Sequence, residues 1–115
     1  MAGAPAYVSI DRVGPEHADG VYALYAEAWW AVDRSRESVV RMLEHTPVTT
    51  GLVEAASGRL VGFARALTDR TLVALVLDVI VASDLRGRGL GGRLMTELLA
   101  RPELSGLDYL ELTCQ

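Results

Sequence analysis

The sequence predicts a single α/β domain in which helices cover a mixed central sheet on both faces. The first part of the chain gives one strand pattern and two helical patterns, after which the apolar residues change to the period of strands. A long apolar run is then followed by an amphipathic helix and a last strand, an order that favours a right-handed crossover between parallel strands. The chain has 115 residues, half of them apolar, which suits one domain with a real core.

The first elements follow from the spacing of apolar side chains. Residues 7–13 alternate and predict a strand, which the following Gly-Pro pair ends. A helix is predicted from about His17 to Trp30, with apolar groups at Val21, Leu24, Tyr25, Ala28 and Trp29. A second helix is predicted over 35–45, with Ser35 as its N-cap and a buried side formed by Val39, Val40, Met42 and Leu43.

The middle of the chain predicts a hairpin and a central strand. Residues 50–55 and 60–67 read as two strands joined by a tight turn at 57–59. Residues 72–81 are apolar on both faces, which predicts a central strand covered by helices.

The last two elements are a helix and a strand. The helix starts at Gly89 and is ended by Pro102, and its apolar residues recur every three or four positions: Leu90, Leu94, Met95, Leu98 and Leu99. Residues 107–113 alternate as a strand, which the crossover should place parallel to the central strand.

Composition excludes several functions. The net charge is −4 and the eleven cationic residues, all arginine, are scattered, which argues against a nucleic-acid partner. The longest apolar run is too short for a membrane span and Asp78 interrupts it. The first residues do not resemble a secretory signal, so a cytoplasmic protein is expected. One cysteine, Cys114, and two histidines predict no metal site.

A glycine-rich segment at 82–92 is the strongest functional signal. Four glycines leave backbone N–H groups unshielded just where a helix begins, and such N–H groups bind phosphate or pyrophosphate: Gly87, Gly89, Gly91 and Gly92. Arg86, Arg88 and Arg93 add positive charge nearby. An acidic protein can thus bind a strongly anionic cofactor through a local group of donors.

Two other interpretations of this segment were weighed. One is a glycine-rich connector with no ligand. The other is a dinucleotide fingerprint, because Gly87, Gly89 and Gly92 satisfy G-x-G-x-x-G. Five residues separate the strand from Gly87, which argues against that motif, although Glu111 falls near the distance of its acidic ribose ligand. A phosphate-transferring P-loop is excluded, since the chain has no lysine.

The segment from Asp78 to Met95 resembles motif A of the GCN5-related N-acetyltransferase (GNAT) family, whose signature is Q/R-x-x-G-x-G/A. Arg86, Gly89 and Gly91 fill its three fixed positions, and the order of elements matches the family over nearly the whole chain. Many members have proline where this chain has Ser83. The resemblance implies a GNAT-like mixed sheet in the order β-α-α-β-β-β-α-β, with residues 1–115 forming a single domain that lacks the family's C-terminal elements.

The resemblance also implies acetyl-CoA as cosubstrate and assigns residues to it. The pantetheine arm would lie along Val79, Ile80 and Val81 and pair with the backbone of the two valines. The N–H of Val79 would polarise the thioester carbonyl. The pyrophosphate would lie on the loop and helix start: Arg86, Gly87, Arg88, Gly89, Leu90, Gly91 and Gly92. The acceptor amine attacks directly in this family, so Cys114 is not needed as a nucleophile.

Three further residues are candidates for the acceptor side. Asp78 is the only charge in its strand and is proposed as the general base, since apolar surroundings raise the pKa of a carboxyl group. The alternative, that Asp78 orients the amine or caps a loop, stays open. Trp30 and Glu27 are predicted to contact the acceptor, a small-molecule or peptide amine.

The C-terminal end departs most from the family. Members continue with a helix that commonly supplies a tyrosine as general acid, and Tyr109 does not match that position. A partner chain could complete the fold, and an exposed edge at 107–113 would favour a homodimer. A non-catalytic acyl-CoA-binding or strand-swapped interaction module is therefore the alternative to the enzyme.

Overall fold

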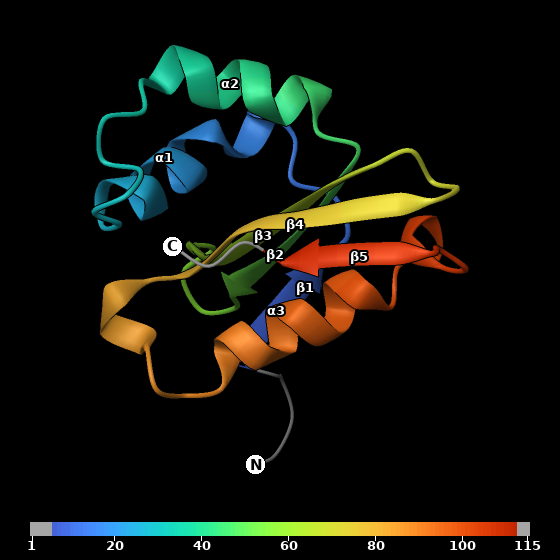
Figure 1. Ribbon diagram of the computed structural model, residues 1–115. Coiled ribbons are helices and arrows are strands. Elements are labelled where there is room, and N and C mark those ends of the chain that lie inside the picture. The colour runs from blue at the N-terminus through green and yellow to red at the C-terminus, as the bar shows by residue number, and fades with distance from the viewer. Residues whose placement is uncertain (1–5, 113–115) are drawn as a thin grey trace.

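A computed structural model describes residues 6–112, and Figure 1 shows their arrangement. The elements are β1 (Tyr7–Ile10), η1 (Pro15–His17), α1 (Ala18–Ala26), α2 (Arg36–His45), β2 (Val48–Glu54), β3 (Leu60–Thr68), β4 (Val73–Val81), η2 (Ser83–Leu85), α3 (Leu90–Leu99), η3 (Pro102–Leu104) and β5 (Tyr109–Leu112). The predicted order of helices and strands is confirmed, with most strands a few residues shorter or longer than expected. The prediction for Thr113 lies outside the described residues.

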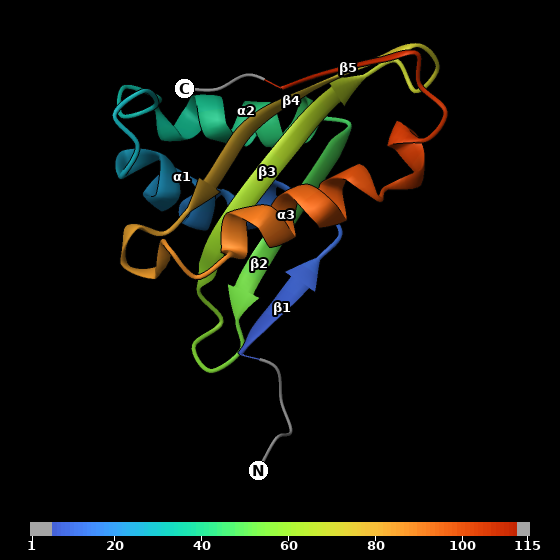
Figure 2. The same ribbon diagram turned by 60° about the horizontal axis from the view of Figure 1, so that its bottom comes forward.

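The sheet is mixed, as the sequence predicts. Its strand order is β1-β2-β3-β4-β5, with antiparallel pairing between the first four strands and parallel pairing between β4 and β5. Helices α1 and α2 cover one face of the sheet and α3 covers the other (Figures 1 and 2). The crossover from β4 through α3 to β5 is the unit that the sequence predicts.

The helices bury the stripes that the sequence indicates, with one difference. Ser35 caps α2, because its side chain accepts a hydrogen bond from the Ser38 N–H. In α3 the buried residues are Leu90, Leu94 and Leu98. Leu99, which the sequence predicts to face the core, is exposed. Spacing of exactly four residues gives a narrow stripe, so the neighbouring position turns to solvent.

Helix α1 is shorter than predicted, which changes the place of Trp29. The helix ends at Ala26, so Trp29 follows it in a turn instead of continuing the apolar stripe, and its side chain is 80% exposed. Trp30, which the sequence places off that stripe, is instead partly buried and packs edge-on against Tyr25. The prediction that Trp29 belongs to the core is therefore wrong.

A β-bulge interrupts β4 at Asp78. Phe63 pairs with Ile80 and Ala66 pairs with Val76, so five residues on β4 lie against four on β3. The side chains of Phe63 and Ala66 point to opposite faces, and so must those of Ile80 and Val76, which an unbroken strand would place on one face. Asp78 absorbs the extra residue with a left-handed φ of 56°, which is uncommon for any residue other than glycine. The bulge thus reverses which residues of β4 face α1.

The edge of β4 is only half covered by β5. Strand β5 pairs with β4 from Val73 to Val76. In the described part of the chain, the second half of β4, from Leu77 to Val81, has a strand partner on the β3 side alone. Among the described residues, the N–H and C=O groups on its other side have no strand partner, which is the kind of edge to which an extended ligand pairs.

Candidate functional site

A cleft of about 250 Å³ lies between the end of α1 and the uncovered half of β4. It brings together six residues that the sequence proposes for the site, with two neighbours from the turn after α1. Its lining is Glu27, Ala28, Trp29, Trp30, Val79, Ile80, Val81 and Arg86. Residues from the cofactor side and from the acceptor side of the prediction thus share one opening.

The backbone of Val81 points into the uncovered side of β4. The N–H of Ala82 donates to the carbonyl oxygen of Val61 at 2.8 Å, so Val81 and Gly62 form a non-hydrogen-bonded pair of the antiparallel ladder. The polar groups of Val81 therefore point away from β3. Arg86 already uses one of them, since its Nε donates to the Val81 carbonyl oxygen at 3.3 Å.

The glycine-rich loop presents backbone donors at the start of α3. Gly87 and Gly89 have φ values of 82° and 80°, a conformation that glycine adopts without strain. Gly89 is the N-cap and has no side chain, so the first-turn N–H groups of the helix have no side-chain cap. A Cβ atom at Gly91 would lie 3.9 Å from the Val81 side chain, an ordinary contact, so packing leaves room for a side chain at this position.

The start of the loop is fixed by two polar contacts. Glu27 accepts hydrogen bonds from the N–H and the hydroxyl of Ser83, at 3.0 and 2.6 Å, and these bonds hold the pKa of Glu27 below its usual value. Asp84 forms an ion pair with Arg59 from the β2–β3 turn, at 2.8 Å. Glu27 is therefore an ionised carboxylate on the wall of the cleft that is also bonded to the protein itself.

Arg93 does not serve the loop as the sequence suggests. Its guanidinium donates to Glu97, to Ser9 and to the backbone oxygen of Tyr7, and these contacts join α3 to β1. The positive charge near the glycines therefore comes from Arg86 and Arg88, whose side chains are exposed.

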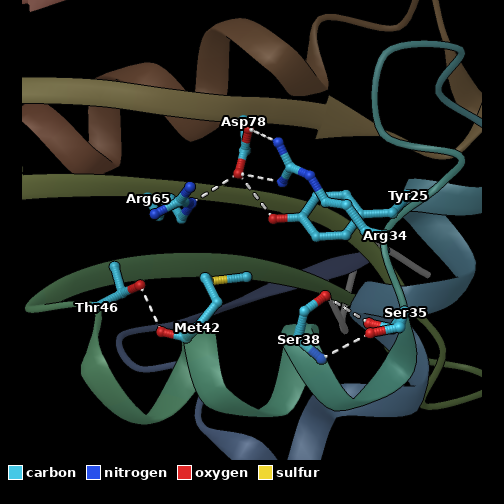
Figure 3. Close-up of polar contacts among 8 residues, drawn as sticks. All are labelled: Tyr25, Arg34, Ser35, Ser38, Met42, Thr46, Arg65 and Asp78. Carbon is cyan, nitrogen blue, oxygen red and sulfur yellow. Dashed lines mark hydrogen bonds and ion pairs between the residues drawn. The ribbon is translucent and has the colours of Figure 1, made fainter.

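Asp78 is the centre of a buried polar network, shown in Figure 3. Its Oδ2 accepts hydrogen bonds from the Tyr25 hydroxyl at 2.8 Å, from Arg34 at 2.9 Å and from the Arg65 Nε at 2.6 Å. Its Oδ1 accepts a second, longer bond from Arg34 at 3.4 Å. The Asp78 side chain is only 2% exposed. Two arginines thus share one carboxylate behind the cleft.

The pKa expected for Asp78 is wrong. Burial alone would raise the pKa of this carboxyl group, as the sequence suggests, but the hydrogen bonds from Arg34 and Arg65 and the positive charge of Arg65 outweigh burial and hold the pKa below its usual value. Burial and the negative charge of Asp78 in turn raise the pKa of the Tyr25 phenol, which stays protonated and donates its hydrogen bond. Asp78 lies in an apolar strand, so the sequence around it gives no sign of the two arginines that contact it from neighbouring elements.

Sequence reasoning missed Tyr25, Arg34 and Arg65 as partners of Asp78. For Arg65 a signal was present, because it and Asp78 are the single charges in two predicted strands that follow one another in the chain. Opposite charges in such positions predict a cross-strand pair. Arg34 lies in the turn before α2, 44 residues from Asp78, and no local pattern indicates its contact.

The comparisons with known proteins agree with this fold. The model of the acetyltransferase (GNAT) family matches residues 11–115, which is nearly the whole chain. The protein belongs to the GNAT family of acetyltransferases. A dinucleotide-binding fold is ruled out, because three of the four strand pairings are antiparallel.

Curated relatives and solved structures show the same family. An uncharacterized N-acetyltransferase, ycf52, of Porphyra purpurea is 37% identical over 59% of this chain, and serotonin N-acetyltransferase 2, chloroplastic, of Oryza sativa subsp. japonica is 36% identical over 69%. The chain spans 40% of the length of each. A crystal structure from Xanthomonas campestris pv. campestris, assigned to the GNAT family, is 28% identical with a TM-score of 0.79, over 98% of this chain and 78% of that one.

Another structural neighbour is diaminobutyrate acetyltransferase from Paenibacillus lautus, in complex with L-2,4-diaminobutyric acid and coenzyme A. It is 21% identical, with a TM-score of 0.73, over 94% of this chain and 65% of that one. At this identity the likeness shows the fold alone.

The described residues limit two further statements. No helix within 6–112 is long and apolar enough to cross a bilayer. Cys114, which the sequence analysis sets aside as a nucleophile, lies outside the described residues.

Proposed function

We propose that the protein is an N-acetyltransferase that moves the acetyl group of acetyl-CoA to a primary amine by direct attack. The observation that carries the proposal is the position of the glycine-rich loop. It opens α3 directly after the uncovered half of β4, so donors for an anion and an unpaired strand edge lie beside each other. These are the two features that a nucleotide pyrophosphate and an extended amide-containing arm require.

Cofactor binding would use backbone more than side chains. The pyrophosphate is proposed to accept hydrogen bonds from the loop and the first turn of α3, with Arg86 and Arg88 supplying charge. The pantetheine arm would pair with the outward-pointing groups of Val79 and Val81 on either side of Ile80. Because Arg86 donates to the Val81 carbonyl oxygen, that oxygen would share its second lone pair with the arm or exchange partners.

The chemical step needs an oxyanion donor and a free amine. The N–H of Val79 is proposed to stabilise the negative charge that develops on the thioester oxygen. The carboxylate of the neighbouring Asp78 already accepts several hydrogen bonds and its pKa is lowered. Both features favour a role in positioning the backbone over the role of general base. In that role Asp78 holds the bulge that orients Val79.

The acceptor is proposed to enter beside Trp30 and Glu27. The ionised Glu27 carboxylate would attract a cationic amine to the cleft. One curated relative is named for serotonin, a small amine, and a small-molecule amine is the acceptor class that we favour here.

Coenzyme A release tests the proposal. Adding a mixture of primary amines to the protein with acetyl-CoA is expected to accelerate free thiol release at least about tenfold over the amine-free rate. The second candidate is a non-catalytic acyl-CoA-binding module, which the low pKa of Asp78 favours because it leaves the base unassigned. That module would bind acetyl-CoA, measured by calorimetry, and release no thiol with any amine.

Trp30→Ala tests the acceptor side. The variant is expected to raise the KM for the amine several-fold and to leave the dissociation constant for acetyl-CoA unchanged, because an aromatic face in the cleft is lost. Trp29→Ala is the matched control, since Trp29 lines the same cleft but is mostly exposed. Equal effects of both variants on the amine KM would argue against a specific role of Trp30.

A homodimer stays a proposal. Support comes from β5, where Tyr109, Leu110 and Leu112 are exposed on the outer strand of the described sheet. Sedimentation of the purified chain measures this directly.

A further inference from the structure

The polar network behind the cleft carries more positive charge than its one carboxylate can neutralise. Asp78 has one negative charge, and Arg34 and Arg65 each have a positive charge. No second carboxylate forms an ion pair with either arginine in the part of the chain that the structure describes. Because Tyr25 is held protonated, the group of four residues keeps one net positive charge.

Arg65 has hydrogen-bond donors that no acceptor among the described residues uses. A carboxylate accepts about four hydrogen bonds, and Asp78 already accepts three on Oδ2 and one on Oδ1. Arg65 contributes only its Nε, so its two terminal nitrogens have no acceptor among the described residues. They are not sealed in the core either, since no buried side-chain nitrogen lacks a partner there. The Arg65 side chain is 14% exposed, so its guanidinium group is partly desolvated and keeps its two terminal nitrogens free to donate.

Arg65 lies near the reacting position. It is opposite Leu77, and Val79 follows two residues further along β4, across the bulge at Asp78. The network also touches the cleft, because the Arg34 guanidinium lies 5.4 Å from the ring of Trp30. A short molecule could therefore hold its amine at Val79 and a second group at Arg65.

We propose that Arg65, with Arg34 behind it, binds an anionic group of the acceptor, a carboxylate or a phosphate. The substrate class is then a small amine that also carries an anion, separated from the nitrogen by a few bonds. A planar guanidinium with two free donors suits either oxyanion, because both accept bidentate hydrogen bonds. This inference rests on the proposed acetyl transfer, and its first test is independent of turnover.

Matched pairs of amines separate charge from shape. O-phosphoethanolamine is compared with ethanolamine, and γ-aminobutyrate with its amide, which lacks the anion, in protein saturated with coenzyme A and at constant ionic strength. NMR signals of the arginine Nε–H groups report binding, and the signal of Arg65 is assigned by its loss in Arg65→Lys. The member with the anion in at least one pair is expected to shift the Arg65 signal saturably, and the members without an anion are expected to leave it in place. A response to the phosphate pair or to the carboxylate pair identifies the oxyanion.

Equal shifts with the members that carry an anion and those that lack it, or no shift with any of the four, would overturn the inference even if the enzyme acetylates some amine. Thiol release with the same compounds gives the second readout. The anionic member of the responding pair is expected to have a kcat/KM higher by about tenfold or more, the effect of one charge-assisted hydrogen bond. Arg65→Gln should remove that preference and Arg65→Lys should keep part of it. Arg41→Gln, at an exposed position of α2, should leave it unchanged.

If no amine promotes thiol release while Arg65 still responds to the anions, the proposed acetyl transfer fails and the anion site stands. The two failures are therefore distinguishable.

Discussion

Replacing Gly91 with aspartate is expected to weaken acetyl-CoA binding by about a hundredfold or more while leaving the protein folded. Gly91 is the second residue of α3, where packing leaves room for a side chain and where no acidic residue stands in the first turn. An aspartate near a helix N-terminus stabilises the helix by about 0.3–1 kcal/mol. The same carboxylate would stand against the pyrophosphate, and repulsion between close charges costs several times that energy.

Calorimetric titration of acetyl-CoA measures the loss, and thermal unfolding confirms that the variant is folded. Gly91→Asn is the matched control, because it adds a side chain of the same shape without charge and should lose much less affinity. Unchanged acetyl-CoA binding by folded Gly91→Asp would contradict the proposal that the pyrophosphate binds at the start of α3.

Removing the carboxylate of Asp78 should destabilise the fold more than any other single change considered for the site. Asp78→Ala leaves two cations and a phenol around an empty acceptor, and breaking a buried ion pair from one side costs about 3–5 kcal/mol. Asp78→Asn keeps the shape and should lose less. Urea unfolding at pH 7 measures both, and Asp33→Asn, at an exposed position, is the control with little expected change.

The pH dependence has a definite sign. A carboxyl group with a pKa lower in the folded than in the unfolded state adds stability above its unfolded pKa, about 3.9, and loses it as the pH falls toward the folded pKa. The stability difference between the natural protein and Asp78→Asn is therefore expected to be full at pH 7 and to shrink below about pH 4. A difference that stays constant between pH 7 and pH 3 would contradict the lowered pKa.

Most of the fold could be predicted because its signals are local. The hairpin turn, the Ser35 cap and the four-residue spacing of leucines in α3 each act over a few residues, and each is confirmed. The glycine loop is local in the same way. The wrong predictions depended on contacts between residues distant in sequence. Arg34 and Arg65 reverse the expected direction of the pKa shift of Asp78, and Arg93 contacts β1 instead of the loop. Trp29 was misplaced because α1 ends one turn early, and boundaries are weakly encoded.

The bulge at Asp78 makes β4 sensitive to its length as well as to its composition. Deleting one residue between Leu77 and Ile80 would remove the bulge and keep Val76 and Ile80 on opposite faces. Deleting one residue within 73–76 would instead make the side chains on one side of the deletion exchange faces of the sheet. The chain can absorb such a change easily at the β2–β3 turn, where Gly58 has open space around it. A scan of single-residue deletions should therefore find an intolerant window at 73–76 and a permissive one at 55–59, even where the deleted side chains themselves make few contacts.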